Sequence, residues 1–152
     1  MEVSFPLDGA GFLRRECPHC EREFKWHNGP ANEQAEQQTP SDVHWCPLCG
    51  EPAGSDQWWT QTQLGLIHNA TERYIGQEVG DMFKGLEQST QNNDVVQFKA
   101  GHIDVPDPSD PLVEPDDMLI VSSPCHAWEP IKIPEDHTGS VHCLVCGAAF
   151  AV

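Results

Sequence analysis

Four of the seven cysteines in this chain form two Cys-Pro-x-Cys motifs. Cys17 and Cys20 make the first motif, and Cys46 and Cys49 make the second, which Gly50 follows directly. Cysteines spaced in this way can point both sulfurs at one ion, and four thiolates complete the tetrahedral shell of Zn²⁺ with Zn–S bonds of about 2.3 Å. The spacing therefore predicts a closed four-cysteine metal site, with four free thiols or two disulfides as the alternatives.

The other three cysteines predict a second site in the last third of the chain. Cys143 and Cys146 repeat the Cys-x-x-Cys-Gly ending, but the position three beyond Cys125 is Trp128, which cannot bind a metal. A histidine must then supply the fourth ligand of a Cys₃His site. The candidates are His126, which we prefer, and His137 and His142.

Short strands are expected to position the first four cysteines, over residues 12–16, around Phe24 and Trp26, and over residues 43–45. Residues 12–54 resemble zinc ribbons. They contain a strand followed by a Cys-x-x-Cys motif, then a polar loop over residues 28–42, and then a second strand and motif ending Cys-Pro-x-Cys-Gly. The resemblance implies a zinc-bound fold and does not specify a function. Rubredoxin-like iron electron carriers share the two motifs, but Glu21 stands here in place of their glycine, so iron ranks below zinc.

A long amphipathic helix is expected over residues 56–89, with Ser55 or Asp56 able to cap it. Gly76 and Gly80 fall on adjacent turns, which predicts that one helix face lies close to another backbone. The apolar stripe either covers the metal modules or docks another protein or a second copy of the chain. The partner-binding residues we predict are Ile67, Tyr74, Ile75, Met82 and Phe83.

The expected fold is a small metal-bound α+β protein, in which a long helix joins two zinc-ribbon modules of short antiparallel strands. Residues 1–54 form the four-cysteine module, residues 55–93 the helix, residues 94–117 a short strand and an acidic Pro-rich linker, and residues 118–152 the Cys/His module. The short strand is placed at 95–99, with 102–105 as its extension. A buried strand is expected at 118–121, and further ribbon strands at 131–133 and 148–152.

The charge of the chain disfavours nucleic acid as a partner. The net charge is −16, and residues 1–28 hold four of the eight basic residues, so the rest of the chain is strongly acidic. Such a field repels phosphate backbones. A nucleic-acid-binding ribbon is the first alternative function, because basic and aromatic residues alternate near the first motif. The residues it would use are Arg14, Arg15, Arg22, Lys25, Trp26 and His27.

We expect a non-catalytic, cytoplasmic adaptor or regulatory subunit that carries two zinc ions. No stretch approaches the roughly 20 apolar residues of a membrane span, and the chain shows no secretory signal pattern. The sequence lacks a phosphate-binding loop, a Gly-x-Ser-x-Gly motif and the His-x-Glu step of zinc deaminases. The enzymatic alternative is a zinc-dependent activity at the second site, with Glu129, Glu135 or Asp136 as its base.

Overall fold

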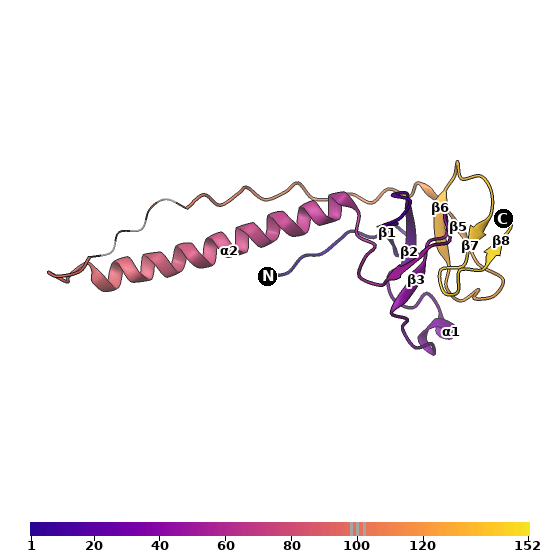
Figure 1. The fold of residues 1–152 in the computed structure, drawn as a ribbon, viewed down its shortest axis with the longest axis horizontal. Coiled ribbons are helices and arrows are strands. Elements are labelled where there is room, and N and C mark those ends of the chain that lie inside the picture. Colours follow the sequence, from indigo (N-terminus) through magenta and orange to yellow (C-terminus); the bar gives the residue numbers. More distant parts are fainter. Residues whose placement is uncertain (98, 100, 102) are drawn as a thin grey trace. The chain divides into compact units, whose positions relative to one another are not determined.

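The computed structural model describes residues 1–97, 99, 101 and 103–152 and divides into two compact units. We call Phe5–Gln61 together with Leu112–Val152 the cysteine unit, because it contains all seven cysteines. Met1–Ser4 together with Thr62–Pro111 form the helical unit. Each unit is described by itself, and Figure 1 gives the element labels used below.

The cysteine unit is built on a four-stranded antiparallel sheet in the order β1-β2-β6-β5. Its strands are β1 (Phe12–Glu16), β2 (Glu23–His27), β6 (Ile131–Pro134) and β5 (Met118–Val121). The register of β2 and β6 pairs Lys25 with Lys132 and Trp26 with Ile131. The two cysteine-containing segments therefore share one sheet. This differs from the expected pair of separate modules at either end of a helix.

Two small hairpins carry the second and third Cys-x-x-Cys motifs of the cysteine unit. Strands β3 (Val43–Trp45) and β4 (Pro52–Gly54) flank the second motif, and β7 (Val141–His142) and β8 (Ala149–Phe150) flank the third. Gly50 and Gly147 end these motifs with φ angles of +79° and +76°, a left-handed conformation that glycine adopts without steric cost. The strands expected at 12–16 and 43–45 are confirmed.

The core of the cysteine unit centres on Trp58, which is fully buried. The rings of Phe24 and Trp26 lie 5.7 Å and 6.0 Å from it, each edge to face, so both aromatic residues of β2 point into the core. The rest of this cluster is mainly aliphatic and cysteine side chains from the hairpins and β6. Its other members are Cys17, Cys46, Leu48, Ala53, Ile131, Ile133, Val141 and Leu144.

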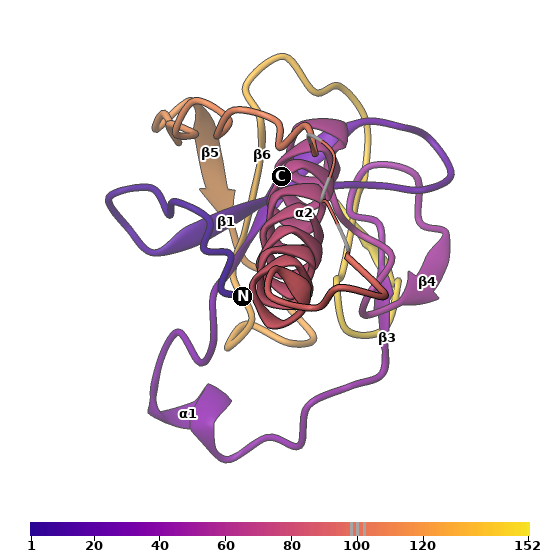
Figure 2. The ribbon, with the colours of Figure 1, turned by 90° about the vertical axis from the view of Figure 1, so that its left-hand side faces the viewer.

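Two expectations for the cysteine unit were wrong. Strand β5 is not buried, because Leu119 and Ile120 are 51% and 58% exposed at the edge of the sheet. The loop over residues 28–42 is not entirely solvated, because it contains the short helix α1 (Glu33–Glu36) between β2 and β3 (Figure 2). Asn32 caps α1 by accepting a hydrogen bond from the Ala35 amide, and Ala35 is buried.

The helical unit contains α2 (Gln61–Thr90) and the segment that follows it. The helix begins later than predicted, because Trp58 is held in the core and its carbonyl accepts a hydrogen bond from the Glu16 amide. The strand expected at 95–99 is absent at Val95–Gln97 and Lys99, and Ile103–Val105 is also irregular. The remaining residues of that prediction, Phe98 and His102, lie outside the described residues.

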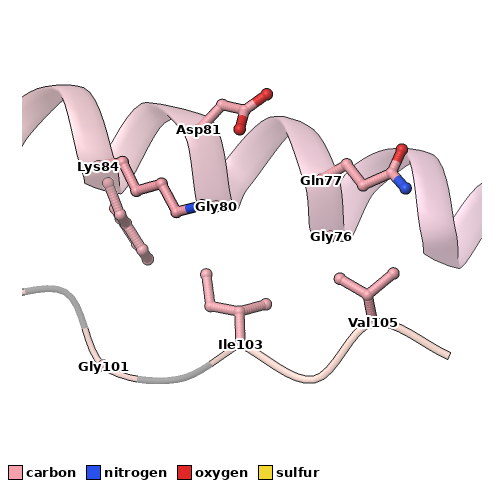
Figure 3. A pocket seen from close by; sticks show the side chains of 9 residues that line it. Gly76, Gln77, Gly80, Asp81, Lys84, Gly101, Ile103 and Val105 are labelled. Atoms are coloured by element: carbon pink, nitrogen blue, oxygen red, sulfur yellow. The ribbon is translucent and has the colours of Figure 1, made fainter.

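The segment after α2 returns along one face of the helix, as the paired glycines predicted. The Asn69 side chain donates to the Asp107 carbonyl (2.9 Å) and accepts from the Ser109 amide (3.1 Å). Gly76 faces Val105 so closely that a Cβ built on the glycine would lie 3.1 Å from Cγ2 of that valine. Ile103 and Val105 point toward this glycine-containing face across a groove of about 570 Å³ (Figure 3).

Candidate metal centres

The first four cysteines converge at the centre of the cysteine unit. The sulfurs of Cys17, Cys20, Cys46 and Cys49 all lie within 4.8 Å of one another, and no disulfide joins them. Sγ of Cys17 is 3.7 Å from that of Cys49, and Sγ of Cys20 is 3.8 Å from that of Cys46. Such spacing is typical of sulfurs that share one tetrahedral ion, because Zn–S bonds of about 2.3 Å place the sulfurs slightly less than 4 Å apart.

Backbone amides prepare these sulfurs to carry negative charge. The His19 and Cys20 amides donate to the Cys17 sulfur at 3.3 Å and 3.4 Å, and the Leu48 and Cys49 amides donate to the Cys46 sulfur at 3.4 Å each. Burial nevertheless raises the pKa of the Cys46 thiol, and charge on Cys17 and Cys20 raises it further. The hydrogen bonds from the Cys49 and Leu48 amides act in the opposite direction and lower this pKa. Four ionised sulfurs in so small a volume need a cation, so this donor set fits a metal ion.

The second cluster contains Cys125, His126, Cys143 and Cys146, with all four ligand atoms within 4.8 Å of one another. Sγ of Cys125 lies 3.5 Å from that of Cys146, and Nδ1 of His126 lies 3.4 Å from Sγ of Cys143. Cys143 is buried, whereas Cys125 and Cys146 are exposed. This cluster also offers four ligands for one ion, and it is more open to solvent than the first.

The structure brings His126 to the second cluster and places the other two histidines elsewhere. His137 lies 3.1 Å from the Ser140 carbonyl through Nε2, and Nδ1 of His142 lies 3.4 Å from the Pro47 carbonyl. Ser123, which sequence reasoning missed, holds the cluster in place. Its hydroxyl donates to the Cys143 sulfur (3.2 Å) and accepts from the His126 amide (3.1 Å).

The second and third Cys-x-x-Cys motifs pack against each other in a near-symmetric way. The Trp45 amide donates to the Leu144 carbonyl, and the His142 amide donates to the Pro47 carbonyl, each at 2.9 Å. The residue before one motif thus bonds to the second residue of the other motif, in both directions. A Cβ on Gly147 would lie 2.5 Å from the Trp45 ring, and one on Gly50 would lie 2.8 Å from the His142 ring. The two ligand clusters are therefore linked directly by these hydrogen bonds and ring contacts.

The five predicted partner-binding residues do not share one face of α2. Tyr74, Ile75 and Met82 are 45%, 54% and 61% exposed, whereas Ile67 and Phe83 are half-buried. Phe83 lines the groove beneath Ile103 and Val105, on the side that the returning segment covers. Phe83 therefore lies beside the returning segment, and partner binding by these five residues stays a prediction.

The basic residues near the first motif are held by other parts of the cysteine unit. Arg14 forms ion pairs with Glu23 (2.9 Å), Glu114 (2.9 Å) and Asp117 (2.7 Å). The Arg15 guanidinium lies over two tryptophan rings, 4.4 Å from the centroid of Trp26 and 4.7 Å from that of Trp59. Lys25 is fully buried and pairs with Glu114 at 2.9 Å. The acidic segment expected to be a solvated linker therefore contacts the chain's own cations.

Comparisons with protein-family models, with curated proteins and with solved structures find no match for this chain. Among the residues that the structure describes, no helix has the length and apolar character needed to cross a membrane. What is established is a small α+β protein with two four-ligand clusters that could each hold a metal ion.

Proposed function

We propose that this chain is a non-catalytic zinc-binding protein that acts as a protein-interaction adaptor or regulatory subunit. Sets of four thiolates, and of three thiolates with one imidazole, are the usual ligands of structural zinc. A bound zinc ion would supply a tetrahedral cross-link between segments distant in sequence. A zinc ion in the first cluster would have its four coordination positions taken by thiolates, which would leave none for a catalytic water.

The observation that carries the adaptor role is an exposed apolar strip on α2. At 100° per residue, Leu64, Ile75, Met82 and Leu86 fall within about 40° of one another around the helix axis. Their side chains are 42%, 54%, 61% and 44% exposed. The helix has 30 residues, so the strip extends along much of a helix roughly 45 Å long. Amphipathic helices with such spacing dock into apolar grooves of other proteins.

Charge supports a protein partner over nucleic acid. Glu72 and Glu78 flank the apolar strip on α2, and three of the four basic residues near the first motif are engaged within the cysteine unit, namely Arg14, Arg15 and Lys25. Counterion release by free Lys and Arg drives most association with duplexes. Negligible binding to generic DNA or RNA at physiological salt is therefore expected, and micromolar, salt-sensitive binding would instead support the nucleic-acid alternative.

The adaptor proposal is tested by placing charge on the strip. In the double variant Ile75→Asp/Met82→Asp, cross-linking to a partner in the native cell or self-association measured by light scattering should be lost. Elemental analysis should still find two zinc ions per chain. The matched control is Gln88→Asp/Asn92→Asp, which changes the net charge by the same amount at exposed positions outside the strip.

Two results would contradict the proposal. If the Ile75→Asp/Met82→Asp variant loses zinc or helical circular dichroism while the control does not, the strip is part of the folded interior. If the variant keeps full association, the strip is not the docking surface.

A further inference from the structure

A cavity of about 510 Å³ lies in the cysteine unit, beside the second metal cluster. Its walls come from the end of β2, the loop that carries α1, and the segment at Trp128 and Glu129. Asn32 ties the loop to the opposite wall, because its side chain caps α1 and also donates to the Trp128 carbonyl at 3.2 Å. The cavity is therefore held open by the fold itself, and its volume is typical of small-molecule sites.

Trp128 offers the cavity an aromatic surface. The other tryptophan in the wall, Trp26, already packs against Arg15 (4.4 Å) and the His44 ring (4.6 Å). Trp128 has an edge-to-face contact with His126, with ring centroids 5.7 Å apart. The remaining apolar lining is small and aliphatic, and consists of Pro30, Ala35, Pro40 and Val145.

The cavity wall contains two acidic side chains and two histidines. The lining contains Glu36 and Glu129 but no lysine or arginine. Glu129 is half-buried; burial raises the pKa of its carboxyl, and the charge of His27, in the same wall, acts against this shift. His44, also in the wall, has a buried Nδ1 without a hydrogen-bond partner in the described part of the chain. Partly buried polar groups left unpaired cost free energy, which a ligand of opposite polarity recovers.

We propose that this cavity binds a small organic cation, namely an amine with a compact apolar body. Its ammonium group pairs with the Glu129 carboxylate, and its apolar part packs on the Trp128 ring. Carboxylate pairing together with an aromatic face is a recurring way to recognise ammonium groups. The wall contains no lysine or arginine that would hold an anion. The ammonium can belong to a free amine or to a lysine side chain, and the experiment separates these two sources.

The first test needs no mutation and uses the zinc-loaded 152-residue chain. Binding of phenethylamine is measured by calorimetry or by tryptophan fluorescence, next to 2-phenylethanol and 3-phenylpropionate, which have a similar body but no positive charge. The amine should bind saturably, the alcohol at least tenfold more weakly, and the carboxylate not at all. Nα-acetyl-lysine methylamide, offered in parallel, should bind more tightly than phenethylamine if the natural source is a lysine side chain, and less tightly if it is a free amine.

Variants then locate the binding. Glu129→Gln and Trp128→Leu should each weaken phenethylamine binding at least tenfold, while the exposed acid variant Glu135→Gln should bind as the unmodified protein does. Zinc content is measured in parallel, so that loss of the neighbouring cluster is not mistaken for loss of the ligand. Equal affinity for amine and alcohol, no binding of either amine, or unchanged binding in a folded Glu129→Gln variant would each overturn the proposal.

Discussion

A buried carboxylate between two lysines holds the sheet of the cysteine unit together. One oxygen of Asp8 accepts hydrogen bonds from Lys132 Nζ (2.7 Å) and Lys25 Nζ (3.3 Å). The other oxygen accepts from the Ala10 and Phe12 amides, each at 3.0 Å. The side chains of Asp8 and Lys25 are fully buried, and that of Lys132 is 6% exposed. Asp8 therefore joins the amino-terminal segment to both β2 and β6.

Asp8→Asn should destabilise the protein by about 3 kcal/mol. The amide keeps an oxygen for the two backbone donors, but it loses the charge that faces the two ammonium groups. Removing one partner of a buried ion pair typically costs about 3–5 kcal/mol. We expect the lower end, because Lys25 keeps Glu114 at 2.9 Å and Lys132 keeps Asp116 at 2.8 Å.

The assay is urea unfolding monitored by tryptophan fluorescence, with free zinc held constant because metal binding shifts apparent stability. The control is Asp136→Asn, the same substitution at an exposed position. A loss below about 1 kcal/mol, in the range measured for exposed ion pairs, would refute the assignment of Asp8 as a buried structural anion.

The same substitution should lose its effect in acid. Burial alone would raise the pKa of Asp8, but hydrogen bonds from Lys132, the Phe12 and Ala10 amides and Lys25 together hold it well below its usual range. A carboxyl with a lowered folded-state pKa stabilises fully above its unfolded pKa of about 3.9, and this stabilisation is lost as the pH falls toward the folded value. The stability difference between the unmodified protein and Asp8→Asn should therefore shrink below about pH 4. Metal release in acid lowers the stability of both proteins, so its effect cancels in the difference between them.

Cys46→Ser should reduce zinc at both clusters, because the motif at Cys46 shares two backbone hydrogen bonds with the motif of the second cluster. Loss of one zinc ion with the other fully retained, measured by elemental analysis, would show that the clusters are independent. Gly76→Ala should loosen the returning segment, because the added Cβ would lie 3.1 Å from the Val105 side chain. In Gly80→Ala the added Cβ has no neighbour within 4 Å, so this variant should stabilise α2 by up to about 1 kcal/mol. Thermal melts followed by circular dichroism compare the two variants, and equal effects would contradict the contact.

The metal ligands could be predicted from sequence because the chemistry depends on local spacing. Two residues between cysteines place both sulfurs on one turn of backbone, wherever the rest of the chain lies. The strand over residues 12–16 could be predicted as well, because Phe12 and Leu13 begin a short segment that leads into Cys17. His126 was the preferred fourth ligand for a similar reason, since a donor adjacent to Cys125 needs only a local turn.

The pairing of the two cysteine-containing segments in one sheet could not be predicted in the same way. Pairing of β2 with β6 depends on contacts between residues about a hundred positions apart, and no local pattern encodes such a register. The lysines that the two strands bring side by side looked like ordinary surface charges in the sequence. Their burial depends on Asp8 and on the acidic residues at 114–117, which composition alone had suggested to be a solvated linker.

The placement of basic residues makes the exposed surface more acidic than the net charge indicates. Of the eight basic residues, Arg14, Arg15, Lys25 and Lys132 are largely or fully buried against acids or aromatic rings. Several carboxylates pair with these cations, but the 24 acids outnumber the eight basic residues threefold. Glu72 and Glu78 flank the strip on α2, where Glu72 lies 3.0 Å from the His68 ring, and Glu36 and Glu129 line the cavity beside Trp128. Long-range electrostatic steering will therefore favour cationic molecules at both surfaces, and raising the salt concentration should slow association at both.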